Sequence, residues 1–159
     1  MNKKNGFTLV ELMVVIVIIG VLAAVAIPKM MAATNKAKAG EGPQILRSIA
    51  SMEAAYKAEN DTYINATQGD KTAAVPGNAW YELGFDQNPF SRYFSFNVTS
   101  GVAVNTDGSY GGNVSNSFTA TAALLAGLGD AGIGESLTVD QTDSRTGSTN
   151  IKKLVPNWK

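Results

Sequence analysis

An apolar run near the N-terminus most constrains how this chain can fold. From Leu12 to Ile27 every residue is apolar or Gly, and the 21 residues from Phe7 to Ile27 have only Thr8 and Glu11 as polar interruptions. An α-helix rises about 1.5 Å per residue, so this segment would be about 30 Å long, which is the thickness of the hydrocarbon core of a bilayer. The run can therefore span a membrane.

Two ordinary interpretations of such a run are open at this point. It could be a secretory signal peptide, with Lys3 and Lys4 as the basic region and residues 24–26 as a small-residue cleavage site. It is, however, longer than the about 7 to 15 apolar residues of a signal core, and its pattern does not stop at Pro28. It could also be a plain single-span anchor. Lysines flank the run on both sides, so they do not settle its orientation.

Glu11 distinguishes between these interpretations. An ionised side chain inside a membrane helix costs several kcal/mol and usually marks a partner. If the chain were cut between Gly6 and Phe7, a new α-amino group would appear four residues before Glu11, and it would be largely cationic at neutral pH. Four helical positions span about 6 Å along the axis, so the two groups could pair within one chain or between subunits staggered by about a turn.

The residues around Glu11 closely resemble the class III signal of type IV prepilins and of type II secretion pseudopilins. The similar residues are Lys3-Lys4-Asn5-Gly6 followed by Phe7-Thr8-Leu9-Val10-Glu11-Leu12-Met13-Val14-Val15. This motif is specific, because it fixes a Gly, an aromatic residue and a Glu at set spacing ahead of a full-length apolar run. The strong similarity covers residues 1–63, and beyond them it concerns architecture only.

The resemblance implies how the chain is processed and assembled. A dedicated membrane peptidase is expected to cut after Gly6 and to methylate the amine of Phe7. Glu11 is expected to pair with the Phe7 amine of a neighbouring subunit during filament assembly. Gly20 and Pro28 fall where the family has helix-weakening residues, so the helix is expected to loosen there in the filament. An assembly motor and an inner-membrane platform are also implied as partners.

The helix is predicted to continue beyond the membrane. Pro28 removes a backbone donor, yet residues 29–33 are helix formers, which favours a bend over a stop. After a cluster of Gly and Pro at residues 40–43, apolar side chains recur at spacings of four, three and four: Ile45, Ile49, Met52 and Tyr56. We interpret this stripe as the packing face of one long, bent helix whose second half is amphipathic. Two helices joined by a true linker are the alternative.

Residues 64–159 change to a strand pattern. Alternating apolar residues at Phe94, Phe96 and Val98, and again at Phe118, Ala120 and Ala122, predict half-buried antiparallel strands. Residues 137–139 and 151–155 flank a polar stretch, which predicts a closing hairpin. We therefore expect an α+β fold in which a long N-terminal helix, hydrophobic and then amphipathic, packs on an antiparallel sheet of three or four strands. The expected segments are a leader (1–6), a membrane and filament-core half (7–28), an amphipathic half (29–63) and an outer domain (64–159).

Loop residues in the outer domain admit a ligand interpretation that we do not favour. Trp80 and Phe85 are expected to fill the small core. Residues 105–109, and Asp130 with Glu135, have the oxygen chemistry of calcium ligands. Turn chemistry explains the Asp-Gly pair at residues 107–108 more simply, and the calcium site that the resemblance associates with major pseudopilins has no convincing match here. No metal or cofactor is predicted.

Composition excludes several functional classes. The absence of Cys and His removes the usual thiolate nucleophile, general base and metal ligands, so an enzyme is not expected. Lys+Arg and Asp+Glu both total 13, so no net charge favours binding of nucleic acid.

The energetics of the apolar run connect it to function. Exposing the 16 residues from Leu12 to Ile27 to water would cost on the order of tens of kcal/mol. The segment must therefore pass from lipid into a bundle of like segments, and identical head-to-tail contacts generate an open filament. We predict a pilin that forms a type IV pilus-like homopolymer, made as a single-pass inner-membrane precursor and ending in a filament at the cell surface. A major pseudopilin of a type II secretion system and a non-polymerising, membrane-anchored binding domain are the alternatives.

Overall fold

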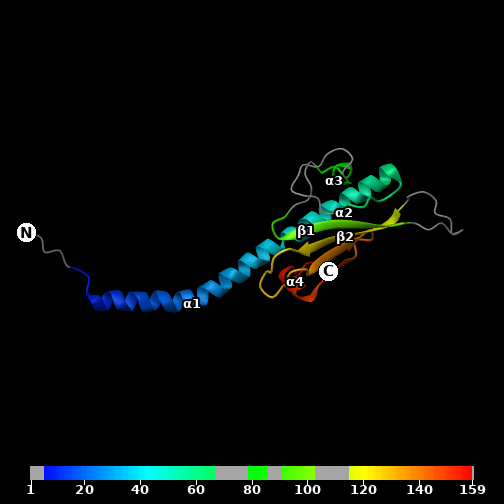
Figure 1. The fold of residues 1–159 in the computed structure, drawn as a ribbon. Helices are drawn as coiled ribbons and strands as arrows, with labels where there is room; N and C mark the ends of the chain where they lie inside the picture. Colours follow the sequence, from blue (N-terminus) through cyan, green and yellow to red (C-terminus); the bar gives the residue numbers. More distant parts are fainter. Residues whose placement is uncertain (1–5, 67–78, 86–90, 103–114, 159) are drawn as a thin grey trace, which may run out of the picture. The chain divides into compact units, whose positions relative to one another are not determined.

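The computed structural model describes residues 6–66, 79–85, 91–102 and 115–158, and its contacts divide the chain into two compact units, Met1–Asn35 and Lys36–Lys159. Each unit is described by itself. The helices and strands, in chain order, are α1 (Leu9–Ala39), α2 (Glu41–Asn60), α3 (Ala79–Glu82), β1 (Phe94–Val102), β2 (Ser115–Leu124), β3 (Ser136–Asp140), β4 (Arg145–Gly147) and α4 (Thr149–Leu154) (Figure 1).

The first unit contains most of α1 and has no core of its own among its described residues. Its large apolar side chains from Phe7 to Met31 are exposed, with exposed fractions between 48% at Val15 and 88% at Phe7. Pro28 lies inside α1, so the predicted continuation of the helix through this residue is confirmed. The bend predicted at Pro28 stays a prediction.

Helical hydrogen bonding continues from α1 into α2. Gly40 separates the two elements in right-handed helical conformation, with φ −64° and ψ −19°, and its N–H donates to the Lys36 carbonyl oxygen at 3.1 Å. Pro43 has no N–H to donate to the Ala39 carbonyl oxygen, so the run lacks one intrahelical bond there but continues to Asn60. The result is one helical run of 52 residues, Leu9–Asn60, rather than two helices joined by a linker.

In the second unit, α2 lies along one face of a four-stranded antiparallel sheet of order β1-β2-β3-β4 (Figure 1). The register places Val98 opposite Ala120, and Ala120 opposite Val139. The inward side chains of three strands are all buried: Phe94, Phe96, Val98, Phe118, Ala120, Ala122, Leu124, Leu137 and Val139. The predicted α+β fold, with its half-buried alternating strands, is confirmed.

The face of α2 that packs on the sheet is centred on Leu46, Ile49 and Glu53, all fully buried. Of the predicted stripe, Ile49 belongs to this core, whereas three members are partly buried and pack along its edge: Ile45, Met52 and Tyr56. Gly42 allows the close approach of α2 to β1, because a Cβ at that position would lie 3.0 Å from ring carbons of Phe94.

The predicted closing hairpin through residues 151–155 is wrong. The strand that forms a hairpin with β3 is β4. The chain turns between them at Asp140, whose Oδ1 accepts from the N–H of Thr142 at 2.8 Å and of Ser144 at 3.0 Å. Residues 149–154 form helix α4 instead. Ile151 and Val155 are buried at a spacing of four, which is the helical period rather than the alternation of a strand.

Candidate functional site

The most distinctive site in the described chain lies at the beginning of α1. Gly6, Phe7 and Thr8 precede the helix and belong to no helix or strand. Gly6 is exposed, and a Cβ built on it would have no heavy atom within 4 Å. Phe7 is 88% exposed. The Gly6–Phe7 peptide bond, where cleavage is predicted, therefore lies outside the helix in open surroundings.

Thr8 and Glu11 form a reciprocal hydrogen-bonded cap. The Glu11 N–H donates to Thr8 Oγ1 at 3.2 Å, and the Thr8 N–H donates to Glu11 Oε2 at 3.1 Å. Thr8 Oγ1–H also donates to Glu11 Oε2 at 2.9 Å. This is the arrangement of a capping box, which satisfies backbone donors that the first helical turn leaves without partners.

Glu11 thus has hydrogen-bond donors within its own chain but no charge partner among the residues that the structure describes. Both bonds from Thr8 go to Oε2, and within the same residues Oε1 accepts none. The neighbouring side chains of α1 are apolar and exposed. The pairing of this carboxylate with a cation of a neighbouring subunit stays a prediction.

The helix that follows Glu11 is long and apolar enough to cross a membrane, judged by its length and composition, and its apolar window is not buried within the chain. Gly20 lies inside α1, where a Cβ would meet no heavy atom within 4 Å, and Pro28 lies inside it eight positions later. The loosening of the helix at these two residues in a filament stays a prediction.

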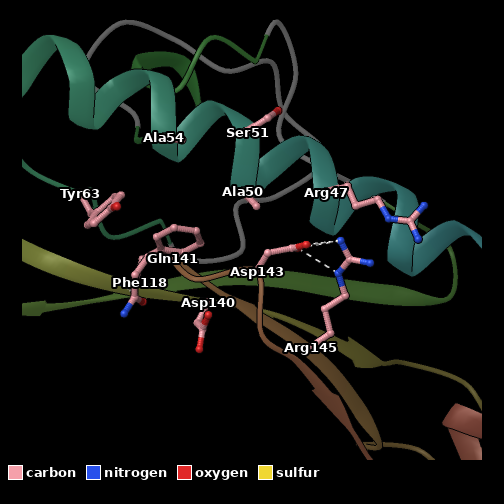
Figure 2. A pocket seen from close by; sticks show the side chains of 10 residues that line it. All are labelled: Arg47, Ala50, Ser51, Ala54, Tyr63, Phe118, Asp140, Gln141, Asp143 and Arg145. Carbon is pink, nitrogen blue, oxygen red and sulfur yellow. Dashed lines mark hydrogen bonds and ion pairs between the residues drawn. The ribbon is translucent and has the colours of Figure 1, made fainter. Parts of the chain in front are cut away.

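A second feature is a pocket of about 320 Å³ in the second unit, between α2 and the turn that joins β3 to β4 (Figure 2). Its charged groups have structural partners. Arg145 donates from Nε and Nη2 to Asp143 Oδ1, at 2.9 Å and 2.7 Å. Its guanidinium lies 5.4 Å from the ring centroid of the buried Trp158. Asp140 is engaged in the turn. No nucleophile and base face each other among the residues that line this pocket: Arg47, Ala50, Ser51, Ala54, Tyr63, Phe118, Asp140, Gln141, Asp143 and Arg145.

Sequence reasoning missed the buried acid of α2. Glu53 is fully buried, its Oε2 accepts from the Ile64 N–H at 3.3 Å, and its Oε1 has no hydrogen-bond partner within the described ranges. Burial raises the pKa of Glu53 to about 7, and the bond from Ile64 opposes that rise. The available signal was its position, four residues after Ile49 and seven after Leu46, on the same helical face.

The loop residues considered for calcium have other roles where they are described. Glu135 accepts from the N–H of Gly132 at 3.2 Å, from Asn150 Nδ2 at 3.0 Å and from the Ile151 N–H at 2.9 Å, so it joins a loop to the first turn of α4. Across the described residues, no three His, Cys, Asp or Glu side chains gather as metal ligands. Residues 105–109 lie outside the described ranges. Trp80 is buried and meets Phe85 edge to face, with ring centroids 5.7 Å apart.

Comparison with known proteins decides what kind of N-terminus this is. The family model described as the prokaryotic N-terminal methylation motif matches residues 1–27. The chain begins with a prepilin-type methylation motif. The resemblance to type IV pilins and type II secretion pseudopilins is therefore confirmed.

The similar proteins include both fimbrial proteins and components of type II secretion systems. Over its whole length the chain is 28% identical to a fimbrial protein of Pseudomonas aeruginosa, covering 93% of that protein. It is 39% identical over 68 residues to the type II secretion system core protein G of P. aeruginosa, a match that covers 43% of this chain and 48% of that protein. It is also 38% identical over 80 residues to the type IV major pilin protein PilA of Myxococcus xanthus, covering 50% of this chain and 36% of that one. The chain thus spans about half the length of the secretion-system relatives that it matches.

Proposed function

We propose that this chain is the structural subunit of a type IV pilus-like surface filament. The observation that supports this most directly is that the large apolar side chains from Phe7 to Met31 are exposed, whereas the second unit buries its large apolar side chains in a core. Removing the 16 residues from Leu12 to Ile27 from lipid into water would cost on the order of tens of kcal/mol. A bundle of α1 helices from neighbouring subunits provides the required apolar surroundings.

In this proposal the chain is first processed and then assembled. The precursor spans the inner membrane once, and the prepilin peptidase removes residues 1–6 and methylates Phe7. The inner-membrane assembly platform then moves the subunit into a helical filament at the cell surface, where Glu11 pairs with the Phe7 amine of a neighbour. Residues 7–28 form the filament core, where Gly20 and Pro28 let the helix loosen, residues 29–63 the amphipathic half, and residues 64–159 the outer domain.

The match over the full length favours a pilin over a pseudopilin, because a fimbrial protein is similar across both units of this chain whereas the core protein G relatives match between 43% and 52% of it. By name these relatives are a fimbrial protein, a type IV major pilin and a core protein of a secretion system, and none is named as an enzyme. A role in catalysis therefore has no support from them.

The proposal is tested in the native host by replacing the chromosomal copy with variants. Wild-type cells should display fibres whose subunits begin at N-methylated Phe7, seen by electron microscopy and mass spectrometry. The Glu11→Ala chain should still be cleaved but should give few or no fibres, because the charge partner is lost. Glu59→Ala, at an exposed acid of α2, is the matched control and should assemble normally.

The outcome also separates the alternatives. Normal fibre yield from Glu11→Ala contradicts the charge pairing. Cleaved subunits without long fibres, together with loss of secreted proteins from the medium on deletion, would favour the pseudopilin function suggested by the core protein G relatives. A monomeric protein that begins at Met1 or Asn2 would overturn both and favour a membrane-anchored binding domain.

A further inference from the structure

The Thr8–Glu11 cap lies directly beside the bond that is to be cut. Thr8 stands in the N-cap position, since α1 begins at Leu9, and the Leu12 N–H donates to the Thr8 carbonyl oxygen at 3.3 Å as the first helical bond. Phe7 is the residue immediately before the cap. Two residues, Phe7 and Thr8, thus separate the Gly6–Phe7 bond from the first residue of α1, at a place where the helix could extend toward the N-terminus.

The backbone donors at this end of α1 need acceptors, most of all near lipid, where water does not supply them. There are two sources within the chain. One is the pair of side chains seen here, Thr8 and Glu11. The other is the set of main-chain carbonyls of residues 4–7, which become acceptors if the helix extends by another turn. Extension would place Gly6 and Phe7 inside the helix, and a bond within a helix is cut only in the fraction of molecules that open locally.

We propose that Thr8, together with Glu11, is a positioning residue for leader cleavage: the capping box ends α1 at Leu9 and so holds the Gly6–Phe7 bond in non-helical backbone for the peptidase. This inference rests on the proposed function, because it requires that the leader is removed. Gly6 acts in the same direction, since Gly disfavours helix by about 1 kcal/mol relative to Ala.

The cap is compatible with the later role of Glu11. Thr8 occupies Oε2 through its N–H and its hydroxyl, whereas Oε1 has no hydrogen-bond partner in the described part of the chain. One oxygen can therefore hold the helix end while the other meets the amine of a neighbouring Phe7. Gln at position 11 would preserve an oxygen acceptor for the cap, as in the S/T-x-x-E/Q motif, but would remove the charge. The two roles can consequently be separated by substitution.

The test uses the full-length precursor in detergent micelles with the prepilin peptidase of its host, and initial rates of leader removal are followed by mass spectrometry over a range of precursor concentrations. The cap variants are Thr8→Ala and Glu11→Ala. For each, KM should rise about fivefold with kcat unchanged, since loss of a cap reduces the competent fraction by about that factor. Thr8→Ser and Glu11→Gln should be cleaved like the wild type. Thr34→Ala is the matched control, because Thr34 Oγ1–H donates to the Met30 carbonyl oxygen at 2.8 Å far from the cap.

A second measurement distinguishes positioning from direct recognition of the hydroxyl by the peptidase. In the absence of peptidase, amide exchange at Leu9 and Val10 should slow in Thr8→Ala, because extension of the helix by a turn gives their N–H groups the carbonyl oxygens of residues 5 and 6 as acceptors. Unchanged exchange at Leu9 and Val10, or cleavage of Thr8→Ala at the wild-type KM, overturns the inference and leaves the proposed function intact. Failure of the peptidase to cut the wild-type precursor overturns the proposed function itself.

Discussion

The two halves of the helical run Leu9–Asn60 each contain an acid in an apolar setting, and the settings are opposite. Around Glu11 the apolar side chains are exposed, and the carboxylate takes hydrogen bonds from Thr8. Around Glu53 the apolar side chains are buried against the sheet, and among the described residues the carboxyl has one donor, the Ile64 N–H. The two halves thus differ in what surrounds them within the chain: the first half leaves its apolar side chains exposed, and the second half buries its apolar face against the sheet.

This comparison predicts its largest effect when the two units are separated. A chain limited to residues 36–159 should be soluble without detergent and should unfold cooperatively, because the described core lies within this unit. The full chain should sediment as aggregates unless detergent or lipid is present, since water contact of the apolar run costs on the order of tens of kcal/mol. Analytical ultracentrifugation and thermal circular dichroism measure both. A truncated chain without a cooperative transition would show that α1 stabilises the second unit.

The next largest effect compares two leucines. Leu46→Ala removes a fully buried side chain and should lower the free energy of unfolding of the second unit by about 2 to 5 kcal/mol. Leu22→Ala removes the same atoms from a residue that is 65% exposed and should leave that unfolding unchanged. Urea titrations of both full-length variants in detergent, followed by Trp fluorescence, test the pair. Equal losses would mean that the first half of the helix also contributes to the core.

The sequence could predict the elements that follow a plain period. The four-three-four spacing of Ile45, Ile49, Met52 and Tyr56 located the second helix half, and alternation located β1 and β2. The sequence could not predict the centre of the buried face of α2. The apolar period is defined by apolar residues, whereas one of the central buried positions is occupied by the acid Glu53. That centre depends on the close contact of Gly42 with Phe94, which are distant in the chain.

Two other features show what local patterns leave open. The segment 151–155 is predicted as a strand because its apolar residues follow a polar stretch, whereas the turn at Asp140 closes the hairpin early and Glu135 accepts hydrogen bonds from the start of α4. At the candidate site, Gly6, Phe7 and Glu11 were recognisable from the motif. The Thr8-x-x-Glu11 spacing also fits a capping box, and this spacing indicates a hydrogen-bonding role for Glu11 that its charge alone does not.

The buried acid gives the third prediction, in the pH dependence of stability. The pKa of Glu53 is raised from 4.5 to about 7 in the folded state, so the folded chain binds the proton more tightly than the unfolded chain does. Its contribution is therefore present below pH 4.5 and is lost as the pH rises toward 7, by about 3 kcal/mol in total. Glu53→Gln, which keeps an acceptor for the Ile64 N–H, should remove this slope and be the more stable protein at pH 8.

The exposed Glu59→Gln is the control for that experiment, since it lies on the same helix outside the core. Urea unfolding of residues 36–159 at pH 4.5, 6 and 8 provides the free energies. If Glu53→Gln retained the wild-type slope of stability between pH 4.5 and 7, then Glu53 would not be the group that titrates. Burial of this acid would then not be the cause of the pH dependence.

The smallest expected effect has the opposite sign and comes from Glu135. The side-chain hydrogen bond from Asn150, followed by backbone bonds from Gly132 and Ile151, lowers the pKa of Glu135 despite some desolvation. Its contribution to stability is therefore present above the pKa of the unfolded chain and is lost as the pH falls through that of the folded chain. Glu135→Gln should reduce stability at neutral pH and flatten the acidic part of the profile, whereas the exposed Asp130→Asn should not. Measured together, Glu53→Gln and Glu135→Gln would separate two parts of the stability profile of the second unit. The loss of stability as the pH rises toward 7 would be due to the buried Glu53, and the loss at acidic pH, the acidic limb, to the hydrogen-bonded Glu135. An unaltered acidic limb in Glu135→Gln would assign that limb to Asp140 instead, whose pKa is lowered by its bonds from Thr142 and Ser144.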